Sequence, residues 1–177
     1  MKSKVNLELK YLIKDFRPIR KILRDIGARK IETKFQKDYF FNLPRNEDKK
    51  APARLKLRIE KKTKTFVFYR RPTFSDISST SADVTLLASK DPTFRFFTKV
   101  LGIKVIVEKK RELWRKGNTI FNLDRVRKVG NVFEIEVWTT PKTLKADRKI
   151  FVEYREKLLP YLSEIVKGSN EDLVSKC

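Results

Sequence analysis

Residues 54–59 read Arg-Leu-Lys-Leu-Arg-Ile, a strict alternation of cationic and apolar side chains, and this pattern decides the fold. Successive side chains of a β-strand point to opposite faces, so the three cations share one face and the apolar residues the other. Residues 4–12 show the same period of two. Further strands are predicted at 34–43, 65–71, 84–88, 104–114, 118–127 and 132–139.

Two short helices interrupt these strands at matching places in the chain. Asp15 and Asp91 are expected to begin them, and Gly27 and Gly102 are expected to end them. Each half of the chain then reads as a strand, a helix and three strands. We therefore predict an α+β fold, an eight-stranded antiparallel barrel with helices packed outside it.

The remaining segments complete a single predicted domain over residues 1–177. Its tunnel strands cover about 4–139, and a C-terminal helical segment covers about 146–167, broken near Pro160. The polar stretch 44–52 is predicted as a loop and the Ser- and Thr-rich stretch 75–83 as a flexible connection. No stretch has the composition of a linker between two domains.

The composition limits the chemistry. The chain has 43 Lys and Arg against 22 Asp and Glu, a net charge of +21, so an anionic partner is expected among nucleic acids, polyphosphates, nucleotides and anionic membranes. It has no histidine, which excludes Ser-His and Cys-His catalysis and His-ligated zinc. The one cysteine, Cys177, cannot form an internal disulfide, so a reducing, cytoplasmic location is expected, with no signal peptide or membrane span.

Charged residues recur on one face of strand after strand. If the apolar faces lie outward under the helices, these charged rows converge on a lumen that needs a polyanion to neutralise its cations. Triphosphate fits this need, and carboxylates in the same lumen would then hold Mg²⁺ or Mn²⁺. The residues that share faces are Glu8 with Lys10; Arg54 with Lys56 and Arg58; Arg70 with Phe66 and Phe68; Lys109 with Arg111; Asn122 with Asp124; and Glu134 with Glu136.

Six segments, in order, resemble motifs of the CYTH family, which includes class IV adenylyl cyclases and thiamine triphosphatases among the triphosphate tunnel metalloenzymes. The family patterns are ExExK, LRxR, TYKxP, KKRxxY, LDxV and FxExE. The corresponding residues are 6–10 (NLELK), 53–56 (ARLK), 68–72 (FYRRP), 109–114 (KKRELW), 123–126 (LDRV) and 133–136 (FEIE). The resemblance runs from about Asn6 to Trp138.

The resemblance implies roles for ten residues and one more cation beyond the motif. Seven residues would bind phosphate: Lys10, Arg54, Lys56, Arg58, Arg70, Lys109 and Arg111. Four would bind metal: Glu8, Asp124, Glu134 and Glu136. Three of these, Glu8, Glu134 and Glu136, would also be catalytic by positioning water. Asn6 replaces the first glutamate of the family pattern, and residues 84–88 lack the glutamate usual in that strand.

Three functions are compatible with this set of residues. The first is metal-dependent hydrolysis of a triphosphate compound, which can be inorganic triphosphate, a nucleotide or an organic triphosphate. The second is an adenylyl cyclase that makes cyclic AMP from ATP. The third is a non-catalytic protein that binds polyphosphate or RNA with a 5′-triphosphate. No membrane partner is expected, and the sequence leaves the oligomeric state open.

Overall fold

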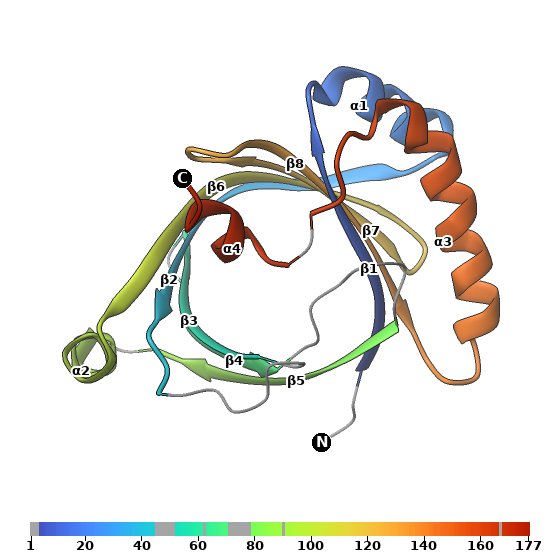
Figure 1. Cartoon of the computed structure of the whole chain (residues 1–177). Helices are drawn as coiled ribbons and strands as arrows, with labels where there is room; N and C mark the ends of the chain where they lie inside the picture. The colour runs from blue at the N-terminus through green and yellow to red at the C-terminus, as the bar shows by residue number, and fades with distance from the viewer. Residues whose placement is uncertain (1–3, 45–51, 62, 71–78, 90, 167) are drawn as a thin grey trace.

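A computed structural model describes residues 4–44, 52–61, 63–70, 79–89, 91–166 and 168–177, with backbone only for 4–6 and 79–84. The predicted order of a strand, a helix and three strands, repeated twice, is confirmed (Figure 1). The first half comprises β1 (Lys4–Ile13), α1 (Phe16–Asp25), β2 (Arg29–Phe41), β3 (Ala53–Glu60) and β4 (Thr63–Arg70). The second comprises β5 (Ser79–Ala88), α2 (Asp91–Leu101), β6 (Ile103–Lys116), β7 (Thr119–Val126) and β8 (Gly130–Thr139). After them come α3 (Leu144–Leu158), a 3-10 turn (Leu159–Tyr161) and α4 (Asn170–Val174).

The eight strands form a closed antiparallel barrel in the order β1-β5-β4-β3-β2-β6-β7-β8. Hairpins join β2 to β3, β3 to β4, β6 to β7 and β7 to β8. Strands of the two halves pair at four junctions: β2 with β6, β4 with β5, and β1 with both β5 and β8. Closure leaves no long unpaired sheet edge, so every strand contributes one face to the lumen and one to the outside.

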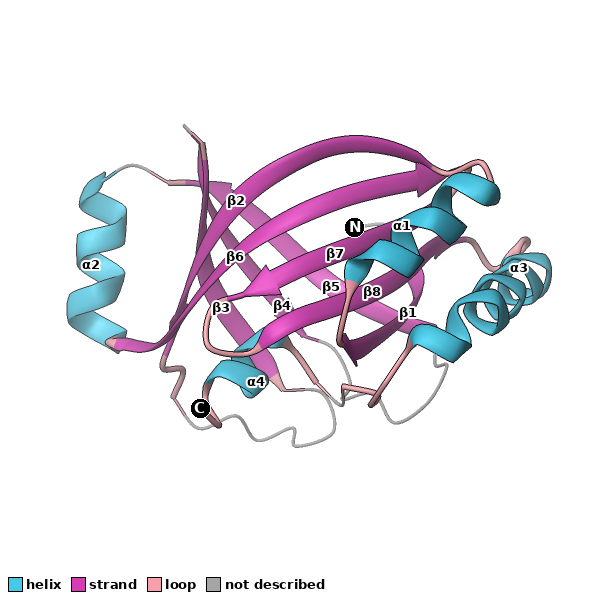
Figure 2. Cartoon of the chain, turned by 90° about the horizontal axis from the view of Figure 1, so that it is seen from above, coloured by secondary structure: helices cyan, strands magenta, loops and turns pink. Residues whose placement is uncertain are grey.

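Three helices cover parts of the outer face, as predicted. The apolar faces of α1 and α3 pack on the outward side chains of β1, β7 and β8, where Leu9, Phe121 and Ile135 form the largest core cluster. Phe94 and Phe97 of α2 pack on a separate cluster. Figure 2 shows α2 on one side of the barrel and α1 with α3 on the other. No helix in the described residues combines the length and apolar character needed to span a membrane.

Local signals at the helix ends acted as expected. Asp15 is the N-cap of α1, and its side chain accepts a hydrogen bond from the backbone N–H of Arg17. Gly27 and Gly102 follow α1 and α2 with φ of +79° and +68°, a conformation that glycine adopts without strain. Pro160 lies in the 3-10 turn that ends α3, so the helix predicted to 167 ends at Leu158.

Two predicted strand boundaries were wrong, and one short helix was not predicted. β2 begins at Arg29 rather than near residue 34, because its first residues pair with the far end of the long strand β6. Residues 79–83, expected in a flexible connection, belong to β5, since they pair with β1 and β4. The sequence did not predict α4, which lies inside the ring of strands in Figure 1 and contacts β6. The predicted loop 44–52 falls mainly on residues outside the described ranges.

The packing of α3 on the barrel gives a stability prediction. Phe151 of α3 is fully buried, whereas Phe96 of α2 is 60% exposed. We expect Phe151→Ala to lower the free energy of unfolding by about 3–5 kcal/mol, because it leaves a cavity in the main core. Phe96→Ala should change it by less than about 0.5 kcal/mol. Urea denaturation followed by circular dichroism measures both, and equal losses would contradict the assignment of the main core.

Candidate functional site

The strand register decides which side chains face the lumen. Glu8 of β1 lies opposite Glu136 of β8, and Lys10 lies opposite Glu134. The intervening residues, such as Leu9 and Ile135, belong to the outer core under α1 and α3. Since neighbours across an antiparallel pair point to the same face, the charged row of each strand enters the lumen. The predicted convergence of the charged rows is therefore present for β1, β3, β6, β7 and β8.

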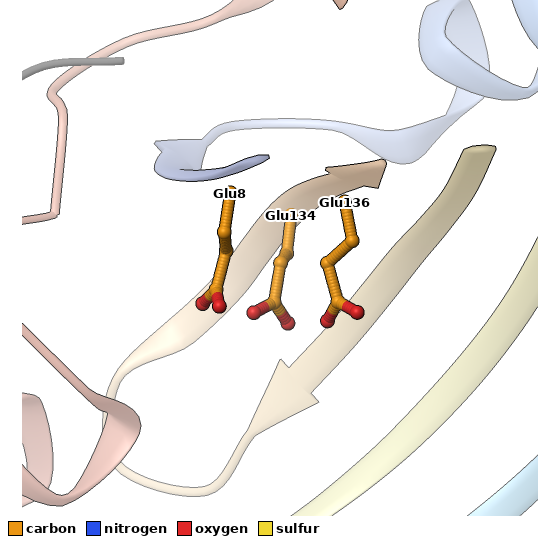
Figure 3. Close-up of side chains that lie close together, drawn as sticks. All are labelled: Glu8, Glu134 and Glu136. Atoms are coloured by element: carbon orange, nitrogen blue, oxygen red, sulfur yellow. The ribbon is translucent and has the colours of Figure 1, made fainter. Parts of the chain in front are cut away.

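Three carboxylates converge at one place in this lumen. Glu8 comes from β1, and Glu134 and Glu136 come from β8 (Figure 3). One carboxylate oxygen from each lies within 4.8 Å of the other two. Glu8 and Glu134 are both 5% exposed. A cluster of oxygen donors of this kind suits a hard divalent cation such as Mg²⁺ or Mn²⁺. All three members were predicted as metal ligands from the sequence.

The ionisation of this acidic cluster is uneven. Burial and the neighbouring charges of Glu134 and Glu8 raise the pKa of Glu136 to about 8. Burial opposes the ionisation of Glu134 too, but Lys10 and Arg111 hold its pKa well below its ordinary value. The cluster thus carries more carboxylate than its nearby cations neutralise, which is the condition that a bound divalent cation relieves. The residues present fit such an ion.

Lys109 and Arg111 of β6 form a compact cationic pair beside the acidic cluster. Asp124 of β7 accepts from Lys109 Nζ at 2.7 Å and from Arg111 Nε at 2.7 Å. A second guanidinium nitrogen of Arg111 lies 2.9 Å from a Glu134 oxygen. Despite burial, Arg111 and Lys109 lower the pKa of Asp124 to about 2. Asp124 was predicted as a metal ligand, but in this structure it positions the two cations and lies outside the cluster of three glutamates.

A second cationic pair, Lys56 and Arg58 of β3, is held in the same way. Asp38 of β2 accepts from Lys56 Nζ at 2.9 Å and from Arg58 Nε at 2.8 Å. Burial and the charge of Arg58 lower the pKa of Lys56 to about 7. The sequence analysis missed Asp38, because it used only the aromatic residues of this strand. Its signal was the polar row Lys34, Gln36 and Asp38, which alternates with Phe35 and Tyr39.

One end of the lumen is apolar and is covered by α4. Leu173 and Val174 pack against the cluster of Phe40, Val107, Val126 and Val132. Ser169 and Asp172 form a capping box at the start of α4, a sequence signal that could have revealed it.

Two carboxylates of α4 form ion pairs with Arg54, a predicted phosphate-binding residue. Glu171, 3% exposed, lies 3.0 Å from Arg54 Nε and 2.8 Å from Lys104 Nζ. Asp172 lies 3.1 Å from another nitrogen of the Arg54 guanidinium. Arg54 therefore faces the lumen as predicted but is paired with the C-terminal helix.

Arg70 is placed apart from the other predicted cations. On β4 it shares the outward face with Phe66, whose side chain belongs to the core under α2. Its own side chain is exposed. The residue beside it, Tyr69, lies opposite Arg54 and has its ring 5.7 Å from Lys56 Nζ. The structure therefore corrects the prediction that Arg70 binds phosphate in the lumen. Its side chain lies on the outside of the barrel, on the same strand face as Phe66.

The two positions that lack an expected acid both lie in the barrel wall. Asn6 pairs with Trp138 of β8 in β1, two residues before Glu8, and its side chain lies outside the described part of the structure. In β5, Leu86 lies opposite Val67 of β4, and its side chain is 65% exposed. The acidic cluster of described residues therefore draws on β1 and β8 alone.

The role of Asp38 can be tested by its charge. Asp38→Asn removes the anion that two buried cations share, so we expect a loss of about 3 kcal/mol in unfolding free energy. Inorganic triphosphate at millimolar concentration should reduce this loss, because it supplies the missing negative charge. Asp91→Asn, at an exposed ion pair with Lys64, is the control and should cost at most about 1 kcal/mol. A loss that triphosphate leaves unchanged would separate Asp38 from the ligand site.

Comparisons with known proteins agree with this geometry. The chain is 26% identical over 168 residues to a protein of Methanocaldococcus jannaschii named "putative adenylate cyclase", covering 94% of this chain and 90% of that protein. The PH1012 protein of Pyrococcus horikoshii has the same fold, with a TM-score of 0.75, 20% identity and coverage of 96% and 99%. A Hippeastrum protein described as a "putative adenylyl cyclase" with a dominant triphosphatase activity aligns with a TM-score of 0.56, 16% identity and coverage of 91% and 90%. The CYTH domain model matches residues 4–168, and the chain therefore belongs to the CYTH domain family.

Proposed function

We propose that this protein is a metal-dependent hydrolase of triphosphate compounds. The observation that carries the proposal is the contact of Arg111 with both Asp124 and Glu134. Through it, a set of buried cations adjoins the carboxylates that can hold a divalent ion. A ligand rich in phosphate oxygens matches both sets at once, because it can be held by the cations and share the metal with the glutamates.

The proposed binding set consists of lumen cations. The cations next to the acidic cluster are Lys10, Lys109 and Arg111. Two further cations, Lys56 and Arg58, lie on β3 and are paired with Asp38 of β2. Arg111 and Arg58 can each grip two phosphate oxygens, whereas Lys supplies a point charge. We retain Arg54 as a binding residue that must exchange its α4 partners for phosphate, and we leave Arg70 out of the set.

The proposed catalysis is electrostatic. A divalent cation held by Glu8, Glu134 and Glu136 would neutralise charge on the transferred phosphoryl group. Arg111 and Lys109 would stabilise charge that builds on the phosphate oxygens during the transfer. Burial and the charges of Glu134 and Glu8 raise the pKa of Glu136 to about 8, so without a metal its carboxyl would hold a proton near neutral pH. As a carboxylate in the metal-bound cluster it would position the attacking water. None of these steps requires a covalent nucleophile, in keeping with a chain that lacks histidine.

A class IV adenylyl cyclase is the second candidate, supported by the name of the Methanocaldococcus jannaschii relative. A cyclase releases pyrophosphate and cyclic AMP from ATP, whereas a hydrolase releases phosphate or pyrophosphate without a cyclic product. The test is an assay of these products from inorganic triphosphate, ATP and thiamine triphosphate, each with Mg²⁺ and with Mn²⁺. Phosphate release without cyclic AMP is the expected outcome. Cyclic AMP as the main product would favour the cyclase, and binding without turnover would favour the third, non-catalytic function.

A change in the acidic cluster should separate binding from turnover. We expect Glu134→Gln to lower kcat by at least about 100-fold, because it removes a charged metal ligand. Binding of triphosphate without metal should stay equal or become tighter, since Lys10 and Arg111 lose a competing anion. Glu156→Gln, on the exposed face of α3, is the matched control. Initial rates and isothermal titration calorimetry measure the two effects, and a parallel loss of both would contradict the assignment.

A change in α4 tests whether Arg54 contributes to binding. Glu171→Gln removes one anion from Arg54 and Lys104, so we expect the Kd for metal-free triphosphate to fall by about 5- to 10-fold. Glu153→Gln, on the exposed surface of α3, should leave it unchanged. Calorimetric titration measures both values. Weaker binding by Glu171→Gln would show that α4 supports the phosphate site instead of competing with it.

A further inference from the structure

The outer face of the barrel carries a hollow that the proposed function does not use. It has a volume of about 370 Å³ and lies on β2, β6 and β7 and at the start of β8. Its outward lining includes Phe35, Lys110, Arg125, Arg127 and Asn131. Lys109 and Val126 also border it, but the Lys109 side chain is paired with Asp124 in the lumen and Val126 packs in the inner apolar cluster. In Figure 2 the strands β2 and β6 run uncovered between α2 and α1. The hollow is therefore on a strip of sheet that the described helices leave open.

Phe35 is the most exposed of the large hydrophobic side chains in the described residues. It lies in the middle of β2, yet its side chain is 69% exposed. The other aromatic residues of the same strand, Tyr39, Phe40 and Phe41, each pack in a core cluster. A single exposed hydrophobic side chain is common, but a large aromatic ring at the edge of a hollow lined by cations offers a flat face for a ligand.

A row of polar side chains continues from Phe35 across the sheet. The register pairs Phe35 with Lys110, Lys110 with Arg125, and Arg125 with Asn131. Neighbouring strands lie about 4.8 Å apart, so these four side chains follow one another at that spacing on one face. Lys110 Nζ lies 5.5 Å from the centre of the Phe35 ring. The Phe35 ring therefore lies beside two cations, Lys110 and Arg125, on the same face of the sheet.

The hollow has a surplus of positive charge. Among the described residues that line it, the acidic one is Glu108. Its carboxylate is already paired with Lys37 at 2.8 Å and with Arg127 at 2.6 Å. Lys110 and Arg125 add two further charges, and both side chains are exposed. The surface therefore attracts anions, and the Phe35 ring adds a flat apolar face beside them.

We propose that this hollow binds single-stranded nucleic acid, with a base stacked on Phe35 and phosphates on Lys110, Arg125 and Arg127. Stacking on an aromatic side chain and a cationic path for the backbone are the two features of sequence-tolerant single-strand binding. A duplex keeps its base faces stacked and cannot use the ring. Ile31 of β2 and Ile106 of β6 are also exposed but do not line the hollow. The hollow itself therefore presents one ring among cations, whereas a membrane surface would favour several protruding apolar side chains.

This site is separate from the lumen. Lys110 lies between Lys109 and Arg111 in the sequence, but strand alternation turns it to the opposite side of the barrel wall. A polynucleotide on the outer face and a triphosphate in the lumen can therefore bind at the same time. For this reason the proposal stands or falls independently of the hydrolase.

The first test uses a fluorescent 12-residue oligouridylate with a 5′-hydroxyl end, measured by anisotropy in the presence of saturating inorganic triphosphate. We expect Phe35→Ala to raise its Kd by about 10-fold, from the loss of one stacked base. Phe35→Trp should preserve or improve binding, and Phe96→Ala, at a similarly exposed ring on α2, should not change it. The stabilisation of Phe35→Ala by triphosphate should equal that of the wild type, which verifies folding and an intact lumen.

The second test measures the phosphate contacts through salt. The double variant Lys110→Gln and Arg125→Gln should lower the slope of log K against log salt concentration by about 1.4, as expected for two single-strand phosphate contacts. The pair Lys145→Gln and Lys149→Gln on α3 is the control and should leave the slope unchanged. Two results would overturn the proposal. One is equal binding of the oligonucleotide by Phe35→Ala and the wild type, and the other is an equal fall in salt slope for the two double variants. Phe35-dependent binding to phosphatidylserine vesicles, without any to the oligonucleotide, would also overturn it.

Discussion

The need to balance charge inside a closed barrel governs this structure. Closure turns one face of every strand into the lumen, where charges are poorly screened. Asp38 and Asp124 each meet this need for one Lys and Arg pair on a neighbouring strand. The glutamates Glu8, Glu134 and Glu136 are only partly neutralised, by Lys10 and Arg111. A polyanion would neutralise the lumen cations, and a divalent cation would neutralise the three glutamates. The lumen therefore suits triphosphate chemistry.

The lumen has an apolar end and a charged part. At one end, Phe40, Val107 and Val132 make the inner face apolar, and α4 packs there through Leu173 and Val174. Beyond that end the same strand faces become charged. Glu171 of α4 reaches Arg54 and so brings a carboxylate to a place where phosphate is proposed to bind. The C-terminal helix therefore both completes an apolar core and occupies part of the cation set.

The outer face is divided by the helices. Where α1 and α3 pack, the outward residues are apolar and fully buried, as Phe121 and Ile135 are. Between α1 and α2 the outward row instead carries Phe35, Lys110 and Arg125. The same strands thus present cations on both sides of the barrel wall, and this is how a chain with a net charge of +21 distributes it. The inner cations are paired with aspartate or glutamate, while Phe35, Lys110 and Arg125 of the outer row are exposed.

The order of elements, the two-fold repeat and the residues that share a strand face could be predicted from the sequence, because a period of two and the Asp and Gly signals at helix ends are local properties. The sequence also identified all three glutamates of the acidic cluster. Tertiary structure decided what local pattern could not. Segment 79–83 became a strand only because it pairs with β1 and β4. Asp38 gained its role from cations on another strand. Arg70 lost its expected role because the face that it shares with Phe66 turns outward, toward α2. A helix as short as α4 does not form from its own residues, so its existence and position follow from packing in the barrel end.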